Sequence, residues 1–151
     1  MFEKHIQIML NKVELSDLGS LDELERIGLA ITVVESWLRP INIRLAEYFA
    51  ILLGFNVTCG LCQARYHDNW MDVVGVETTS LWEILKLMED PLCNALIAGE
   101  YLRRNKNTMH DFSIPAITFI YTGARSIYYD DLLVLTLKQL NRRLNVGKSD
   151  I

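Results

Sequence analysis

The chain has 151 residues, of which half are apolar and 23% are charged, with a net charge of −4 and a pI near 5.3. This length suits one domain with a buried core, and the low counts of proline (three) and glycine (eight) disfavour both disorder and a turn-rich β sandwich. Because there is no basic excess to displace counterions, we do not expect nucleic-acid binding through net charge.

No targeting or membrane-spanning segment is recognisable in the sequence. The first residues, MFEKHIQIMLNKVEL, lack the basic start and the small-residue cleavage site of a signal peptide. The longest uncharged stretch, 48–64, contains Gly54, Asn56 and Gln63, and it is too short and too polar to cross a bilayer. The three cysteines are odd in number and form no disulfide framework, so we expect a cytoplasmic protein without a membrane partner.

Helical periodicity begins at the N-terminus. Apolar residues at helical spacing predict a helix over about 2–13, and a break is expected at 15–19. Ser20 and Glu23 match a capping box, in which a hydroxyl and a carboxylate each satisfy one free backbone amide. The apolar stripe that follows predicts a helix over 21–38.

Proline separates this helix from the next one. Pro40 disfavours helical geometry in the residue before it, so a new helix is expected after it and before Gly54, a suitable C-terminal residue. The apolar stripe of this helix consists of Ile41, Leu45, Tyr48 and Leu52.

Capping residues place the helices of the second half. Ser80 precedes a predicted helix that ends near Glu89, and Asp90-Pro91 is an N-cap followed by proline, which predicts a helix to about Arg104. Residues 103–110 are polar and are interpreted as a loop. Residues 114–122 are β-branched and aromatic, so strand and helix are both open, and the Ser113 cap favours helix.

The last helix has its charges at the ends that the helix dipole favours. Asp130 and Asp131 lie at its start, Arg142 and Arg143 lie in its last turns, and Gly147 suits its end. Together these patterns predict an all-α fold, with residues 1–151 forming a single domain of about seven short helices in an irregular or orthogonal bundle.

One motif resembles a metal site. The run 59–72, CGLCQARYHDNWMD, has the spacing Cys-x2-Cys-x4-His-x4-Asp, and Cys59, Cys62, His67 and Asp72 are candidate zinc ligands. On a helix these four side chains point in different directions, and the glycines that make the tight turns of a zinc knuckle are missing. We therefore favour a helix over about 59–74 with two core cysteines and no cofactor, and we keep zinc as the alternative.

Two segments suit a contact surface with a protein partner. The first is an acidic cluster near one helix start, and the second is a tyrosine-rich segment, because tyrosine and arginine are enriched at interface hot spots. Two adjacent tyrosines on a helix diverge by about 100°, so at least one of them is expected near the surface. The candidate contact residues are Asp17, Asp22, Glu23, Glu25, Arg125, Tyr128, Tyr129, Asp130 and Asp131.

The sequence favours a binding function over catalysis. It contains no P-loop, GxGxxG or HExxH motif, and we name no catalytic residue. We expect a small acidic module that holds or neutralises a protein partner, with the size and charge typical of immunity proteins, inhibitors, secretion chaperones and viral or phage regulators. A basic partner suits its charge, and a homo-oligomer is compatible with it.

The alternative function is that of a metal-binding or nucleic-acid-associated regulator. It would use the Cys-x2-Cys-x4-His-x4-Asp site, and local phosphate contacts would come from basic residues. These are Arg103, Arg104, Lys106, Arg142 and Arg143.

Overall fold

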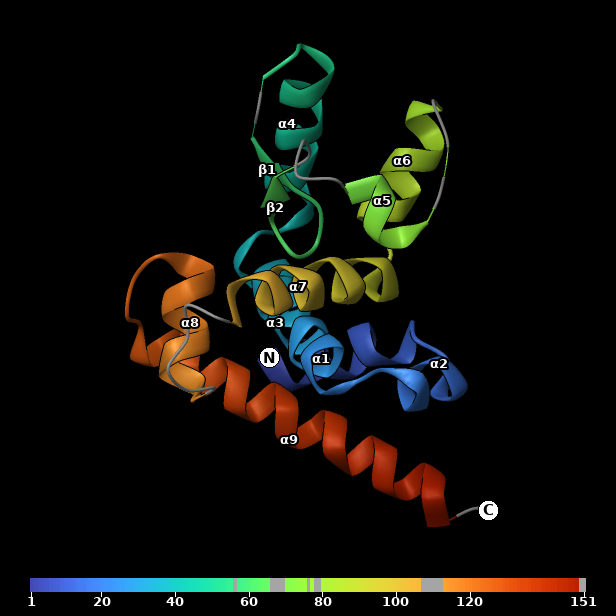
Figure 1. Ribbon diagram of the computed structural model, residues 1–151, viewed down its shortest axis with the longest axis vertical. Coiled ribbons are helices and arrows are strands. Elements are labelled where there is room, and N and C mark those ends of the chain that lie inside the picture. The colour runs from blue at the N-terminus through green and yellow to red at the C-terminus, as the bar shows by residue number, and fades with distance from the viewer. Residues whose placement is uncertain (56, 66–69, 76, 78–79, 107–112, 150–151) are drawn as a thin grey trace.

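The computed structural model describes residues 1–55, 57–65, 70–75, 77, 80–106 and 113–149. These residues contain nine helices and one short antiparallel hairpin (Figure 1). The helices are α1 (Phe2–Asn11), α2 (Leu15–Ser20), α3 (Glu23–Leu38), α4 (Ile41–Leu52), α5 (Trp70–Val74), α6 (Leu81–Met88), α7 (Pro91–Asn105), α8 (Ile114–Thr122) and α9 (Ile127–Ser149). The strands are β1 (Thr58–Cys59) and β2 (Ala64–Arg65), with Cys59 opposite Ala64.

Helices α3 and α7 cross at the centre of the domain, and α9 runs along its lower side (Figure 1). Every residue of α3 from Ile27 to Val34 is buried. Glycine permits the close crossing, since a Cβ atom at Gly28 would lie 2.3 Å from the carbonyl oxygen of Ala95 and 2.7 Å from the amide nitrogen of Gly99. The helices range from five to 23 residues in length, and helices of such unequal length pack irregularly. The predicted fold, a single all-α domain, is confirmed.

Local capping explains why several helices begin where the sequence predicts. The Asp90 carboxylate accepts from the amide of Cys93, and Pro91 occupies the first turn of α7. The Ser113 hydroxyl accepts from the amide of Ala116, and residues 114–122 are helical, as favoured. At the C-terminus the helix continues past Gly147 to Ser149, so Gly147 lies inside α9, where an added Cβ would come within 2.6 Å of the Leu15 side chain.

The start of α3 differs from the prediction. Residues 15–19, expected to form a break, belong to α2, which ends at Ser20, and the Ser20 hydroxyl donates to the carbonyl of Asp17 within that helix. The capping box is made instead by Asp22 and Glu25, which exchange side-chain to backbone hydrogen bonds of 2.8 and 3.2 Å. Two acidic residues therefore serve the helix end that a hydroxyl was expected to serve.

The predicted helix over 59–74 is wrong in its first half. Residues 58–65 form the β1–β2 hairpin, and α5 (Trp70–Val74) is the only helical part of this range among the residues that the structure describes. Gly60 and Gln63 adopt φ angles of +78° and +57°, which an α-helix cannot contain. The hairpin tip is tied to the centre of the fold, since the amide of Cys62 donates to Asn94 Oδ1 at 3.0 Å and the amide of Leu61 donates to the carbonyl of Met88 at 3.0 Å.

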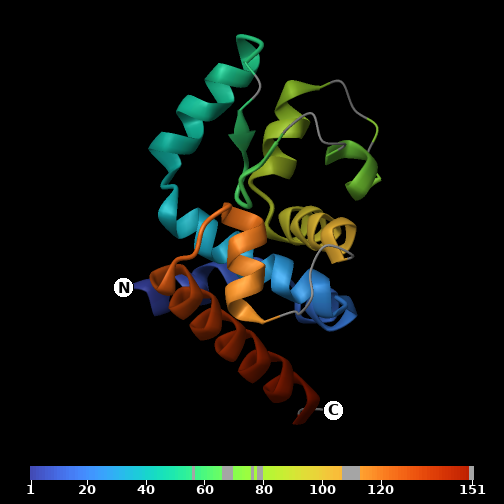
Figure 2. The same cartoon turned by 60° about the vertical axis from the view of Figure 1, so that its left-hand side comes forward.

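Helix α4 stands at the edge of the molecule in both views (Figures 1 and 2). The hairpin lies between it and the pair α5 and α6, as Figure 2 shows. In the part of the chain that the structure describes, no helix combines the length and apolar character needed to cross a bilayer.

Candidate functional site

The predicted acidic cluster is only partly free. Asp17 and Glu23 are exposed, whereas Asp22 and Glu25 cap α3. Asp22 also accepts from Arg103 Nη2 at 2.7 Å. Partial burial tends to raise the pKa of the Asp22 carboxyl group. The hydrogen bond from the amide of Glu25 and the guanidinium of Arg103 outweigh this effect and hold the pKa below its usual value. Half of the cluster is therefore occupied by contacts within the protein.

The tyrosine-rich segment is divided between surface and core. Tyr128 is exposed, while Tyr129 is 4% exposed and its hydroxyl donates to Glu35 Oε1 at 2.9 Å. This confirms that adjacent tyrosines diverge, and it places Tyr129 where no partner reaches it. Asp130 accepts from the hydroxyl of Thr118. The remaining candidates in this segment, Arg125 and Asp131, are exposed.

The cysteines of the motif are core residues. Cys59 and Cys62 are both fully buried, and burial raises the pKa of each thiol to about 12, so both are protonated at neutral pH. Asp72 is exposed on α5, and His67 lies outside the described residues. Within the described ranges no group of three potential ligands is placed to hold a metal ion. The zinc alternative stays a prediction without structural support.

The basic residues named for phosphate contacts are largely paired within the protein. Arg103 binds Asp22 and Glu100, and Arg104 Nε donates to Glu100 at 3.2 Å. Arg143 donates to the side chain of Asn11 and to a backbone carbonyl on the first loop. The contacts to Glu100 lie within α7, whereas those of Arg103 with Asp22 and of Arg143 join distant parts of the chain, so these arginines are engaged within the protein.

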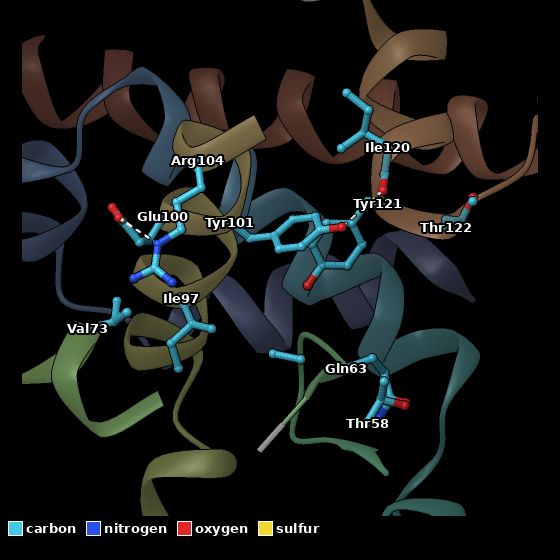
Figure 3. A pocket seen from close by; sticks show the side chains of 12 residues that line it. Thr58, Gln63, Val73, Ile97, Glu100, Tyr101, Arg104, Ile120, Tyr121 and Thr122 are labelled. Carbon is cyan, nitrogen blue, oxygen red and sulfur yellow. Dashed lines mark hydrogen bonds and ion pairs between the residues drawn. The ribbon is translucent and has the colours of Figure 1, made fainter. Parts of the chain in front are cut away.

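A cavity of about 490 Å³ lies between α7, α8 and the hairpin (Figure 3). Its walls include Val73 and Ile97, and the rings of Tyr101 and Tyr121 meet edge to face with centroids 5.4 Å apart. This volume lies within the range of small-molecule sites. On size alone, the cavity is a candidate ligand site.

The polar groups around this cavity are bonded to the protein. Tyr121 donates to the carbonyl of Cys62, and Gln63 Nε2 donates to Glu47 at 2.8 Å. Burial raises the pKa of Tyr121 well above its usual value, and hydrogen bonds from Arg103 lower the pKa of Glu100. At neutral pH the phenol stays protonated and the carboxylate stays ionised, so neither suits proton transfer. The lining does not indicate an active site.

The most unusual surface is the outer side of α4, which sequence reasoning missed. Six large apolar side chains of α4 and of the turn that follows it are between 48% and 74% exposed. We call this surface the α4 ridge. It consists of Ile41, Leu45, Phe49, Leu52, Leu53 and Phe55.

The opposite side of α4 explains why the apolar side faces outward. The two charged residues of this helix point inward: Arg44 is buried and forms a two-point contact with Glu89, at 2.8 and 2.9 Å, and Glu47 is partly buried. Tyr48 also donates to Glu89, which is the C-cap of α6. The predicted stripe of Ile41, Leu45, Tyr48 and Leu52 is therefore wrong as a core face, since only Tyr48 is buried.

One signal of this arrangement is present in the sequence. Residues 41–55 carry charges at Arg44 and Glu47 alone, and these lie on one side of the helix. At 100° per residue, the exposed residues Ile41 to Leu53 cover a sector of about 120° that contains no charge. A helix that is apolar nearly all round is normally buried on every side, so the exposure of this one points to a missing contact.

Comparison with known proteins adds no functional information. No protein-family model, no curated protein and no solved structure matches this chain.

Proposed function

We propose that this protein is a small acidic protein-binding module and that the α4 ridge is its contact surface. The observation that carries the proposal is the orientation of α4, which keeps its charges inside and exposes six large apolar side chains. The largest apolar patch of a typical monomer covers about 300–600 Å², and it is often functional. The ridge reaches the upper end of that range, at about 600 Å², if a large side chain has roughly 150–250 Å² of accessible surface.

The ridge is also held rigidly enough to serve as an interface. Arg44 and Tyr48 both bind Glu89, and Arg44 donates through its third nitrogen to the carbonyl of Arg39 at 2.5 Å. These contacts fix the rotation of α4 about its axis, so the apolar side does not turn inward. A preorganised surface loses little conformational entropy when a partner binds.

Binding through the ridge replaces the contact surface expected from the sequence. Tyr129 is buried and Asp22 is paired, so the carboxylate and tyrosine segments offer less free surface than their composition indicated. The function class, a protein that works by holding another protein chain, remains the proposal.

Site-specific photo-crosslinking tests this proposal in the cells that naturally make the protein. A benzophenone amino acid replaces Phe49 on the ridge, and a matched control replaces Val134, an exposed apolar residue of α9. We expect a discrete protein adduct from position 49 that Leu45→Glu removes and that position 134 does not give. The absence of any adduct at position 49, or the same adducts from both positions, would refute the proposed function.

A further inference from the structure

We infer that the occupant of the α4 ridge is the α4 ridge of a second copy of this chain, in a twofold dimer. This inference rests on the proposed function and names the partner. Four observations carry it: the spacing of the ridge residues, the absence of charge among them, the distribution of other apolar side chains, and the area available.

The spacing suits helix-to-helix packing. Ile41, Leu45, Phe49 and Leu53 are each four residues apart and form one continuous row along α4. Rows of this kind pack into the grooves of an identical row when two helices cross at about −50°, the commonest class of helix contact. In a twofold arrangement Leu45 and Phe49, at the middle of the row, lie near the crossing point.

The charge pattern permits the ridge to meet itself. In a twofold contact each residue faces the same set of residues on the partner, so a charge within the surface would meet a like charge. The ridge contains none, because Arg44 and Glu47 are engaged on the inner side with Glu89, Arg39 and Gln63. The net charge of −4 on each copy is carried elsewhere, and it does not oppose the contact locally.

The chain offers no comparable apolar surface elsewhere among the described residues. The other strongly exposed apolar side chains are dispersed, since Ile127, Tyr128, Val134 and Val146 are spread along the 23 residues of α9, and Ile8 and Trp82 lie singly on α1 and α6. Single exposed apolar residues of this kind are ordinary. A copy that docked on the ridge with another part of its surface would leave its own ridge exposed, whereas a ridge-to-ridge contact buries both.

The area agrees with a stable dimer. Two ridges of about 600 Å² each would bury at most about 1,200 Å² from these side chains, and flanking residues would add to this area. Specific protein interfaces begin at about 1,200 Å² of total buried surface. The twofold contact therefore lies at the lower limit of a specific interface, which is the size class of weak and transient complexes.

Sedimentation velocity over a wide concentration range tests the dimer directly. We expect the mass of the purified chain to move from 17.4 kDa toward twice that value as concentration rises. Phe49→Glu and Leu45→Glu should each weaken dimerisation by at least about tenfold, which corresponds to 1.4 kcal/mol. Val134→Glu, the matched control on α9, should leave dimerisation unchanged, and circular dichroism should show that all three variants fold.

Several outcomes would overturn the inference. They are a chain that stays monomeric at all concentrations, a dimer that Phe49→Glu does not weaken, and a dimer that Val134→Glu weakens equally. A monomer that binds phosphatidylcholine vesicles through the ridge would assign the ridge to a lipid surface instead.

A crosslinking arm separates this inference from the proposed function. Leu45→Cys treated with a short bismaleimide should give a covalent dimer, and Val134→Cys should not. Cys59 and Cys62 are buried and out of reach of the reagent, and the Val134→Cys variant reports any reaction of the partly exposed Cys93. If the purified chain is monomeric but the benzophenone at position 49 captures a different protein in cells, the second-copy inference fails and the proposed function stands. If neither experiment gives an adduct, both fail.

Discussion

Replacing Gly28 with alanine should destabilise the whole domain. Gly28 lies where α3 crosses α7, and the added Cβ would sit 2.3 Å from the carbonyl oxygen of Ala95 and 2.7 Å from the amide nitrogen of Gly99. Carbon-to-oxygen contacts are ordinarily about 3.3–3.6 Å. Both neighbours are backbone atoms, so no side-chain rotation relieves the contact, and the two helices must separate by about 1 Å.

The magnitude follows from two opposed effects. Overpacking a close helix contact costs typically about 1–3 kcal/mol, and this site lies at the upper end because the obstructing atoms are backbone. The higher helix propensity of alanine relative to glycine offsets about 1 kcal/mol of this loss in the free energy of unfolding. The net loss should be about 2 kcal/mol, which in a chain of this size lowers Tm by about 4–8 °C.

The assay is urea and thermal denaturation followed by circular dichroism at one fixed protein concentration. The matched control is Gly19→Ala in α2, where an added Cβ meets nothing within 4 Å. This control should be neutral or gain up to about 1 kcal/mol. A Gly28→Ala protein as stable as the wild type would show that α3 and α7 do not cross as closely as described.

Three further variants test the interior. Glu89→Ala leaves the buried guanidinium of Arg44 without its carboxylate, so the free energy of unfolding should fall by about 2–3 kcal/mol in urea titrations, and a loss under about 0.5 kcal/mol would contradict this. Asn94→Ala removes the hydrogen bond that the Cys62 amide donates and the three that Asn94 Nδ2 donates to backbone carbonyls, so we expect a similar loss of about 2–4 kcal/mol. Burial raises the pKa of Glu35 above 4.5 in the folded protein. The protonated Glu35 side chain therefore adds to the free energy of unfolding at a pH below its pKa in the unfolded chain, and this contribution is lost as the pH rises through its pKa in the folded protein. Glu35→Gln should therefore be more stable than the wild type at pH 7 and equal to it below about pH 4, and an advantage independent of pH would refute the assignment.

Helix positions were largely predictable because their signals are local. Asp90 and Ser113 cap α7 and α8 with hydrogen bonds to residues three positions on, and such contacts are readable from spacing alone. The same rule misled at Ser20, because Asp22 offered a stronger cap two residues later. The all-α class follows from such signals summed along the chain.

The candidate site was not predictable, because its residues are placed by distant partners. Arg44 faces inward because Glu89, 45 positions away, meets its guanidinium. That one contact turns the apolar side of α4 outward and reverses the stripe read from periodicity. Periodicity shows that a helix has an apolar side, but it does not show which side the fold covers.

The hairpin shows the same division between local and distant causes. Cys-x2-Cys spacing suited a metal turn or a helix, and the sequence left these interpretations open. The tertiary structure instead contains a β-hairpin, which is held by two contacts of the Cys62 backbone: Asn94 accepts from the amide of Cys62, and Tyr121 donates to the carbonyl of Cys62.

The sequence by itself thus determined the helical class, the position of most helices and the acidic charge. These depend on spacing, capping and composition within one or two turns of chain. Only the tertiary structure decided which carboxylates are free, which tyrosine is buried and which side of α4 is exposed. These depend on pairs such as Asp22 with Arg103 and Tyr129 with Glu35, which lie 81 and 94 positions apart and meet only when the chain folds.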